Sequence, residues 1–172
     1  MPLTPATEAD LAEVSKQLGR PARDIIAIAA RCVCGKPTVV HTKPRLGDGT
    51  PFPTTYYLTH RGATAAVSTL EASGFMAQLQ ERLAEEPELA AAYQKAHEAY
   101  IADRDRAAEQ FNLEVPEIAG ISAGGMPTRV KCLHALIGHS LAAGPGVNPI
   151  GDLALEACSW SPNKCVCEST QL

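Results

Sequence analysis

The stretch that decides the fold spans residues 25–42 and reads IIAIAARCVCGKPTVVHT. It begins with an apolar run of strand length and ends with the β-branched run TVVHT, and both compositions favour β-strands. Gly35 and Pro37, between the two runs, are typical of a turn. A third run, TTYYLT at residues 54–59, has the same character. The pattern predicts three short strands that pair as a small antiparallel sheet.

Helices are predicted on either side of this sheet. Residues 7–18 carry an apolar stripe that follows a threonine, a residue type that caps helix N-termini. After the sheet, apolar residues recur at helical spacing, and a long helix is predicted from Pro87 to about Phe111. A further helix is predicted to begin at Pro127, and a short one covers residues 152–158.

The composition is that of an ordinary globular domain. The chain has 172 residues, of which 45% are hydrophobic and 20% charged, a length and mixture that suit one domain. We expect the α+β class: a helix-rich single domain over residues 7–158, with the small antiparallel sheet near its N-terminal third. Residues 159–172 are expected to form a Cys-containing C-terminal tail.

The charge pattern excludes some classes of function. The net charge is −4, with 15 Lys and Arg against 19 Asp and Glu, so generic nucleic-acid binding is not expected. No apolar run reaches the roughly 20 residues that a membrane span requires. The N-terminus lacks the cationic start and apolar core of a signal peptide. We therefore expect a cytoplasmic protein, in which thiols stay reduced.

The first thiol pair, Cys32-x-Cys34, lies on the predicted turn. Two thiolates on one turn can bind a single ion, and thiolates are the preferred ligands of zinc and of iron–sulfur clusters. His60, at the end of the third strand, is placed to complete a Cys/His site. Cys165 and Cys167 rank behind these residues as further ligands. A redox pair, or simple packing of both thiols, is the alternative interpretation of the turn.

The other cysteines and histidines are open to several interpretations. Cys132 and Cys158 fit equally well as small buried hydrophobic residues. A nucleophilic dyad of Cys132 with His134 or His139 is an alternative. His41, within the second strand, is expected on the surface of the sheet. The sequence contains no complete catalytic signature, so it leaves open whether the protein is an enzyme.

The glycine-rich stretch SAGGMPTRVK at residues 122–131 supports an anion-binding hypothesis. Glycines before a helix N-terminus let backbone N–H groups approach an anion, and basic side chains follow directly. The candidate anion-binding residues are Gly124, Gly125, Arg129, Lys131 and His134. The stretch matches neither glycine-rich nucleotide-binding signature, and a simple turn is the alternative. An enzyme or binding protein for a phosphorylated small molecule is therefore a second hypothesis for the function.

Several long blocks resemble a known family. RCVCGKP, PRLGDGTPFPTTYYLTH, LEASGFM and GISAGGMPTRVKCLHALIGHSLAAGPGVNPIGD are similar to the actinobacterial domain of unknown function 501 family, which is uncharacterised. Its C-x-C-G turn falls on Cys32, Cys34 and Gly35, and its K-C-L-H block includes Cys132. The resemblance implies that Cys32, Cys34 and Cys132 converge. The resemblance also implies a gene neighbourhood that contains a septum-formation initiator gene. This neighbourhood implies a protein partner in cell division.

These observations favour an uncharacterised cytosolic metal-binding protein. The expected cofactor is zinc or an iron–sulfur cluster, bound by Cys32, Cys34, His60 and Cys132. The first alternative is the enzyme or binding protein that uses the glycine-rich loop to hold an anionic small molecule. The second alternative is an interaction module linked to cell division.

Overall fold

A four-stranded antiparallel sheet lies at the N-terminal end of the fold. The computed structural model describes residues 3–167, and their strands follow one another in the sheet in chain order. The strands are β1 (Thr4–Pro5), β2 (Ile25–Arg31), β3 (Pro37–Thr42) and β4 (Tyr56–Leu58). The three predicted strands and their antiparallel pairing are confirmed. The two-residue β1 was not predicted, because a strand of this length shows no periodicity.

Helices form most of the rest of the described chain, which confirms the α+β class. They are α1 (Glu8–Leu18), α2 (Arg61–Ala72), α3 (Phe75–Glu85), α4 (Pro87–Gln110), α5 (Leu133–Ala143) and α6 (Pro149–Ala157), with a short 3-10 helix η1 (Pro116–Ile118) between α4 and α5. Thr7 caps α1 through a capping box with Asp10. Within residues 3–167, no helix combines the length and apolarity needed to cross a membrane.

Two predicted helix starts were wrong. The helix expected from Pro127 begins at Leu133, because the Gln80 side chain binds the backbone of the preceding segment at the Thr128 carbonyl and the Val130 N–H. The helix expected from residue 152 begins at Pro149, because the Asn148 side chain accepts the Gly151 N–H and caps it. The first start depends on a tertiary contact, which the local pattern does not contain.

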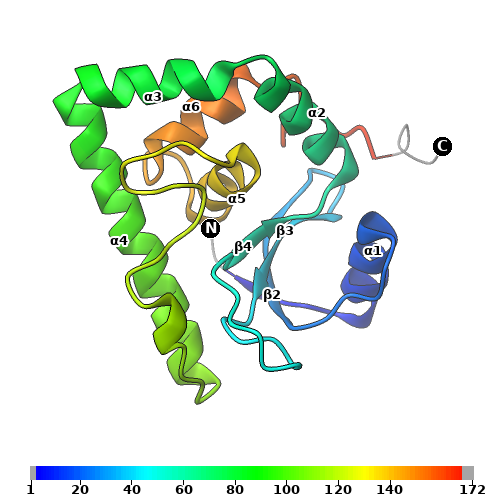
Figure 1. The fold of residues 1–172 in the computed structure, drawn as a ribbon. Coiled ribbons are helices and arrows are strands. Elements are labelled where there is room, and N and C mark those ends of the chain that lie inside the picture. Colours follow the sequence, from blue (N-terminus) through cyan, green and yellow to red (C-terminus); the bar gives the residue numbers. More distant parts are fainter. Residues whose placement is uncertain (1–2, 168–172) are drawn as a thin grey trace.

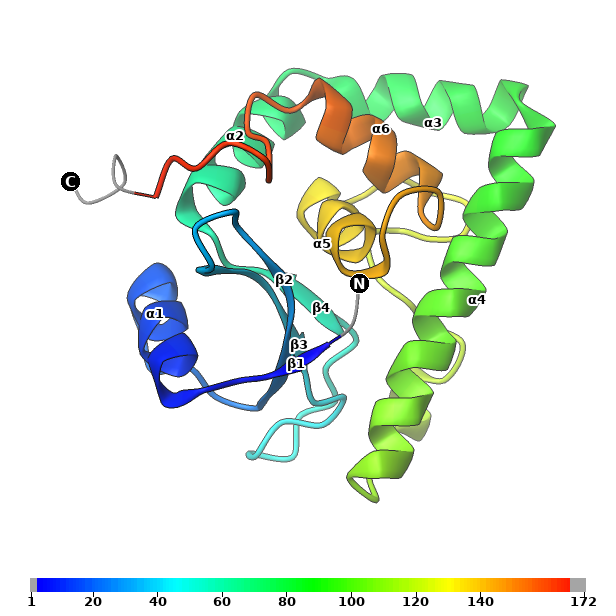
Figure 2. The same ribbon diagram turned by 180° about the vertical axis from the view of Figure 1, so that it is seen from behind.

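The sheet is covered on both faces. Helix α1 lies against one face, and α5 lies against the other, with α6 and the long α4 farther out (Figures 1 and 2). A small cluster of Val14, Ile28 and Val40 fills the α1 side. The main core lies between the sheet and the remaining helices. Helix α5 is therefore enclosed by protein and buried along most of its length.

Two glycines let α5 approach its neighbours at backbone distance. A Cβ atom at Gly138 would lie 2.9 Å from the carbonyl oxygen of Tyr56 in β4. A Cβ atom at Gly151 in α6 would press on the carbonyl oxygen of Leu136 and lie 2.9 Å from the Cβ of Ser140. Any larger residue at either position would push α5 away from β4 or from α6.

Four aromatic rings fill the space between the sheet, α4 and α5. Tyr56 stacks on His139 at a centroid distance of 5.8 Å, and Tyr100 meets His139 edge-on at 5.0 Å. His41 packs against Tyr56 at 5.1 Å and is only 4% exposed. The predicted surface position of His41 is therefore wrong, because its side of β3 faces α5. Burial lowers the pKa of His41 and of His139 to about 4.

The C-terminal segment after α6 returns to the start of α2 (Figure 2). Trp160 is 4% exposed and belongs to the main core, so the packed fold extends past the boundary predicted at residue 158. Of the tail predicted at residues 159–172, residues 168–172 lie outside the described part of the chain.

We predict that Gly151→Ala lowers the free energy of unfolding by about 2 kcal/mol, because the added methyl overpacks a backbone contact. Urea unfolding followed by circular dichroism measures the change. Gly47→Ala is the matched control, because a Cβ there meets its nearest atom, Asp24 Oδ1, at 3.5 Å, an ordinary contact distance. The control should stay within about 0.5 kcal/mol. Equal stability of the two variants would show that α5 and α6 do not need this close approach.

Candidate metal centre

The first thiol pair is held on the tight turn between β2 and β3. Cys32 follows β2 directly, and its carbonyl accepts the N–H of Gly35 at 2.8 Å. Gly35 has a φ of 91°, which favours glycine because it lacks a Cβ. The Cys32 N–H donates to the carbonyl of Lys36 at 2.9 Å. This turn places the sulfur atoms of Cys32 and Cys34 at one end of the hairpin.

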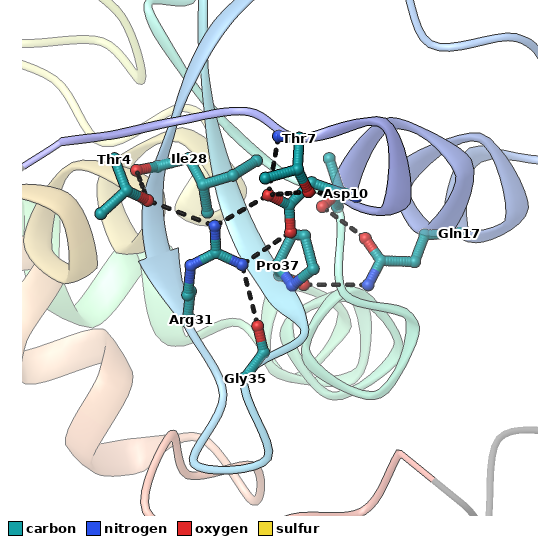
Figure 3. Close-up of polar contacts among 9 residues, drawn as sticks. Thr4, Thr7, Asp10, Gln17, Ile28, Arg31, Gly35 and Pro37 are labelled. Atoms are coloured by element: carbon teal, nitrogen blue, oxygen red, sulfur yellow. Dashed lines mark hydrogen bonds and ion pairs between the residues drawn. The ribbon is translucent and has the colours of Figure 1, made fainter.

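An ion pair between β2 and α1 fixes the hairpin end (Figure 3). The Arg31 guanidinium donates to both carboxylate oxygens of Asp10, at 2.7 and 2.9 Å. Its Nη1 group also donates to the Gly35 carbonyl in the thiol turn at 2.9 Å. Asp10 in turn accepts the N–H of Thr7 at 3.0 Å. One carboxylate thus serves as part of the helix cap and as the counter-ion that holds the turn.

The C-terminal segment brings the second thiol pair to the same place. The ring of Trp160 lies 5.4 Å from the ring of His60, at the start of α2. Val166 packs against the same helix, where a Cβ at Gly62 would lie 3.0 Å from its Cγ2. Cys165 and Cys167, on either side of Val166, place their sulfur atoms next to the thiol turn.

The sulfur atoms of Cys32, Cys34, Cys165 and Cys167 all lie within 4.8 Å of one another. The Cys34 and Cys167 sulfurs are 3.4 Å apart, and those of Cys32 and Cys167 are 3.7 Å apart. Cys32 and Cys167 are buried, whereas Cys34 and Cys165 are exposed. The centre therefore lies at the surface, with one buried and one exposed sulfur from each pair.

His60 contacts the centre as a hydrogen-bond donor. Its Nδ1 accepts the N–H of Ala63 at 3.2 Å and so caps α2. Burial lowers the pKa of His60, which favours the neutral ring, and a neutral ring with an accepting Nδ1 carries its proton on Nε2. Nε2 lies 3.1 Å from the sulfur of Cys167. The His60 ring, which was predicted as a metal ligand, thus offers an N–H to the sulfur of Cys167.

The surroundings of the four thiols differ in their effect on ionisation. The N–H of Lys36 lowers the pKa of the Cys34 thiol to about 7. Burial raises the pKa of Cys32 and of Cys167. The two buried sulfurs therefore become thiolates readily only when a cation is close to them.

Cys132, the other predicted ligand, lies in a separate cluster with Glu71 and His134. It occupies the N-cap position of α5, whereas the thiol turn lies beyond the end of β2. The convergence of Cys132 with Cys32 and Cys34 is therefore not seen, and the C-terminal pair takes its place. The signal for that pair was in the sequence, because the spacing Cys-x-Cys occurs at residues 32–34 and again at 165–167.

The glycine-rich loop uses two of its N–H groups in hydrogen bonds within the loop itself. The Arg129 N–H donates to the Gly125 carbonyl at 2.9 Å, and the Lys131 N–H donates to the Gly124 carbonyl at 2.8 Å. At the start of α5, the Leu133 N–H donates to Glu71 Oε1 at 2.7 Å. A phosphate at this helix N-terminus would have to displace the Glu71 carboxylate. His134 also contacts Glu71, whereas the side chains of Arg129 and Lys131 are exposed.

A cleft of about 850 Å³ adjoins the four-cysteine centre. One wall is the thiol turn with Val33, which is 62% exposed, and another is the segment around Trp160. The ends of α5 and α6 close the remaining side, and they contribute both apolar and acidic side chains such as Leu155 and Glu156. The two segments that carry the cysteines therefore also shape this cleft.

The fold and the site define an α+β protein with a four-cysteine centre at the junction of its first hairpin and its C-terminal segment. Residues 28–156 match the family model described as protein of unknown function (DUF501), and the chain belongs to this family. Comparison with curated proteins and with solved structures gave no match. The matched range includes Cys32 and Cys34 but ends before Cys165 and Cys167.

We predict that Asp10→Asn lowers the free energy of unfolding by about 1–3 kcal/mol at neutral pH, because Arg31 loses its counter-ion. Arg31 holds the pKa of Asp10 well below its usual range. The contribution of the carboxylate is therefore present above about pH 4 and is lost as the pH falls further, so the two proteins should converge in acid. Urea unfolding at several pH values measures this difference.

Glu86→Gln is the control for this prediction. It breaks the exposed ion pair between Arg82 and Glu86, which stays within a single helix turn, and the expected cost is small because solvent screens such a pair. A cost for Asp10→Asn as small as that of the control would contradict the role assigned to Asp10.

Proposed function

We propose that the protein binds one zinc ion through Cys32, Cys34, Cys165 and Cys167. The observation that carries the proposal is the gathering of four sulfur atoms within 4.8 Å of one another, from segments more than 130 residues apart in the chain. Thiolates are soft ligands that favour zinc, copper(I) and iron–sulfur clusters over magnesium or calcium. A four-sulfur set is a common structural zinc site.

The spacing of the sulfurs fits one tetrahedral ion. A zinc–sulfur bond of about 2.3 Å gives a tetrahedron with edges of about 3.8 Å. The observed separations of 3.4 and 3.7 Å are close to this edge. An iron–sulfur cluster needs a wider cage, because its thiolates bind different irons. The geometry therefore supports a single ion. Of the two predicted cofactors, zinc and an iron–sulfur cluster, we propose zinc.

The proposed role of the ion is structural. Four protein ligands leave no open position for a substrate, which distinguishes structural zinc from catalytic zinc. The segment after α6 contains no helix or strand up to residue 167, so ligand bonds would supply much of what holds it on the fold. Bound zinc would also fix the two segments that shape the neighbouring cleft.

A second candidate function, binding of a small molecule, is supported by that cleft. Its volume of about 850 Å³ is in the range of ligand sites, and apolar side chains combined with a few polar groups are typical of such sites. Trp160 gives it an aromatic surface. The interaction module linked to cell division remains a prediction that rests on the family resemblance.

We predict that the purified full chain contains about one zinc per molecule and is colourless, because zinc is d10. Cys34→Ser and Cys165→Ser should each lose most of the metal. Elemental analysis together with an absorption spectrum makes the measurement. Cys158→Ser is the matched control, because Cys158 is half-buried and packs against the main core, outside the centre, so this variant should keep its zinc.

Three results would contradict zinc binding. Stoichiometric iron with visible absorption would show that the centre binds iron and not zinc. A disulfide between Cys34 and Cys167 in freshly purified protein would make the centre a redox pair. Absence of metal together with rapid titration of all the thiols would make the four sulfurs a packing cluster.

We further predict that His60→Asn weakens zinc binding by about 10–100-fold without abolishing it. Asparagine keeps the helix cap, because its side-chain oxygen can accept the Ala63 N–H, but it does not reach the sulfur of Cys167. Competition with a chromogenic chelator measures the affinity. His97→Asn is the control, because His97 contacts Ser122 and not the centre. Complete loss of zinc in His60→Asn would show that His60 is a ligand and not a donor to one.

A further inference from the structure

A second thiol site lies at the opposite end of α2 from His60. Cys132 is the N-cap residue of α5, His134 lies in the first turn of that helix, and Glu71 comes from the last turn of α2. One ligand-type atom from each of the three lies within 4.8 Å of the other two. All three side chains are only partly buried, so the site is open to solvent.

The contacts of His134 favour a positive charge. Nε2 lies 3.2 Å from the carbonyl oxygen of Thr64, which can only accept a hydrogen bond, and 3.3 Å from the hydroxyl of Ser68, which donates its own proton to that same carbonyl. Nδ1 lies 3.1 Å from Glu71 Oε1, which as a carboxylate oxygen also only accepts. These contacts favour a proton on both ring nitrogens, so they support an imidazolium form of His134 held in place by side-chain and backbone oxygens of α2.

The cation lies beside the sulfur of Cys132 and at the N-terminal end of a helix. Contact with His134, and then the N–H of Ala135, lower the pKa of the Cys132 thiol. Contact with Cys132, and then with Glu71, raise the pKa of His134 to about 9. Each group thus favours the charged form of the other, although the Glu71 carboxylate itself opposes a thiolate.

We propose that Cys132 is a nucleophilic thiolate that small hydroperoxides oxidise. It is paired with the imidazolium of His134, and Glu71 holds the His134 ring in position. Cys132 is only partly buried, so a solute of that size can approach it without a binding cavity. The clefts of about 850 and 530 Å³ lie elsewhere, beside the four-cysteine centre and between α1 and the loop after β3. A bulky electrophile would need such a cleft next to the sulfur.

The proposed step is a two-electron oxidation of the sulfur. The Cys132 thiolate attacks one oxygen of hydrogen peroxide, so that an S–O bond forms while the O–O bond breaks. The departing oxygen takes a proton from His134 and leaves as water. Cys132 is oxidised to a sulfenic acid, the peroxide is reduced, and neutral His134 then regains a proton from solvent.

A metal site at the same three residues is the competing interpretation. A histidine that donates from both ring nitrogens has no lone pair to offer an ion. Zinc would have to displace the Nδ1 proton that bridges His134 and Glu71. This difference gives the two interpretations opposite outcomes in one experiment.

The test compares Cys132 with Cys158 in the same molecule. Both are half-buried, but Cys158 lies at the C-cap of α6, the helix end that disfavours a thiolate. The full chain is treated at pH 7 with hydrogen peroxide and dimedone, which traps sulfenic acids, and each cysteine is read by peptide mass spectrometry. Because His134 favours the thiolate of Cys132, Cys132 should react about tenfold faster than Cys158 after allowance for the lower intrinsic nucleophilicity of such a thiolate.

The variants separate the role of His134 from a loss of folding. His134→Gln, checked by circular dichroism, should bring the rate of Cys132 down to that of Cys158, and Cys132→Ser should remove the adduct. Equal rates for the two cysteines in the unaltered chain would overturn the proposal without any variant. Protection of Cys132 by one equivalent of added zinc, in protein whose four-cysteine centre is already loaded or replaced by serine, would also overturn it. Both outcomes are independent of whether the four-cysteine centre binds zinc.

Discussion

The close backbone approach of α5 to β4 and to α6 is the constraint on which the rest of the structure depends. Gly138 and Gly151 remove the side chains that would separate these elements. Because α5 is held at this distance, its N-terminus lies where Glu71 of α2 can accept the Leu133 N–H. Its central turns bring His139 into contact with Tyr56. The position of α6 in turn sets the point from which the C-terminal segment returns to α2. Both thiol sites are thus consequences of how one buried helix packs.

The parts of the fold that the sequence predicted are those that local patterns encode. The β-branched runs predicted β2 and β3, and the capping threonine predicted the start of α1. Both predictions succeeded because strand propensity and capping act over a few residues. The start of α5 was missed because the Gln80 side chain, from a different helix, binds the segment before it. The burial of His41 was missed because TVVHT is apolar or β-branched around it on both faces. Such a run does not say which side of the strand meets a helix.

The sequence predicted the first half of the candidate site directly and its second half, Cys165 and Cys167, only as lower-ranked ligands. The Cys32/Cys34 turn was recognisable because two thiols, a glycine and a proline stand together. Its partner cysteines could not be ranked by loop length, because any of four distant cysteines could close a loop of this length at nearly the same entropic cost. The packing of Trp160 and Val166 against the start of α2 determines which cysteines meet Cys32 and Cys34. The spacing of cysteines in the sequence does not predict this packing. Glu71 was missed for the same reason, since it meets His134 only through the packing of α2 on α5.

The two histidines beside the thiols show how partner geometry sets chemical character. The Nδ1 of His60 faces a donor, the Ala63 N–H, so His60 is neutral and points its one proton at the sulfur of Cys167. His134 faces acceptors on both sides, which favours its cationic form. A neutral N–H beside a sulfur can support a thiolate but cannot balance its charge, so at the first site the proposed zinc ion would supply the balancing charge. The imidazolium balances one thiolate by itself. The first arrangement therefore suits a closed structural centre, and the second leaves a single charged sulfur open to react.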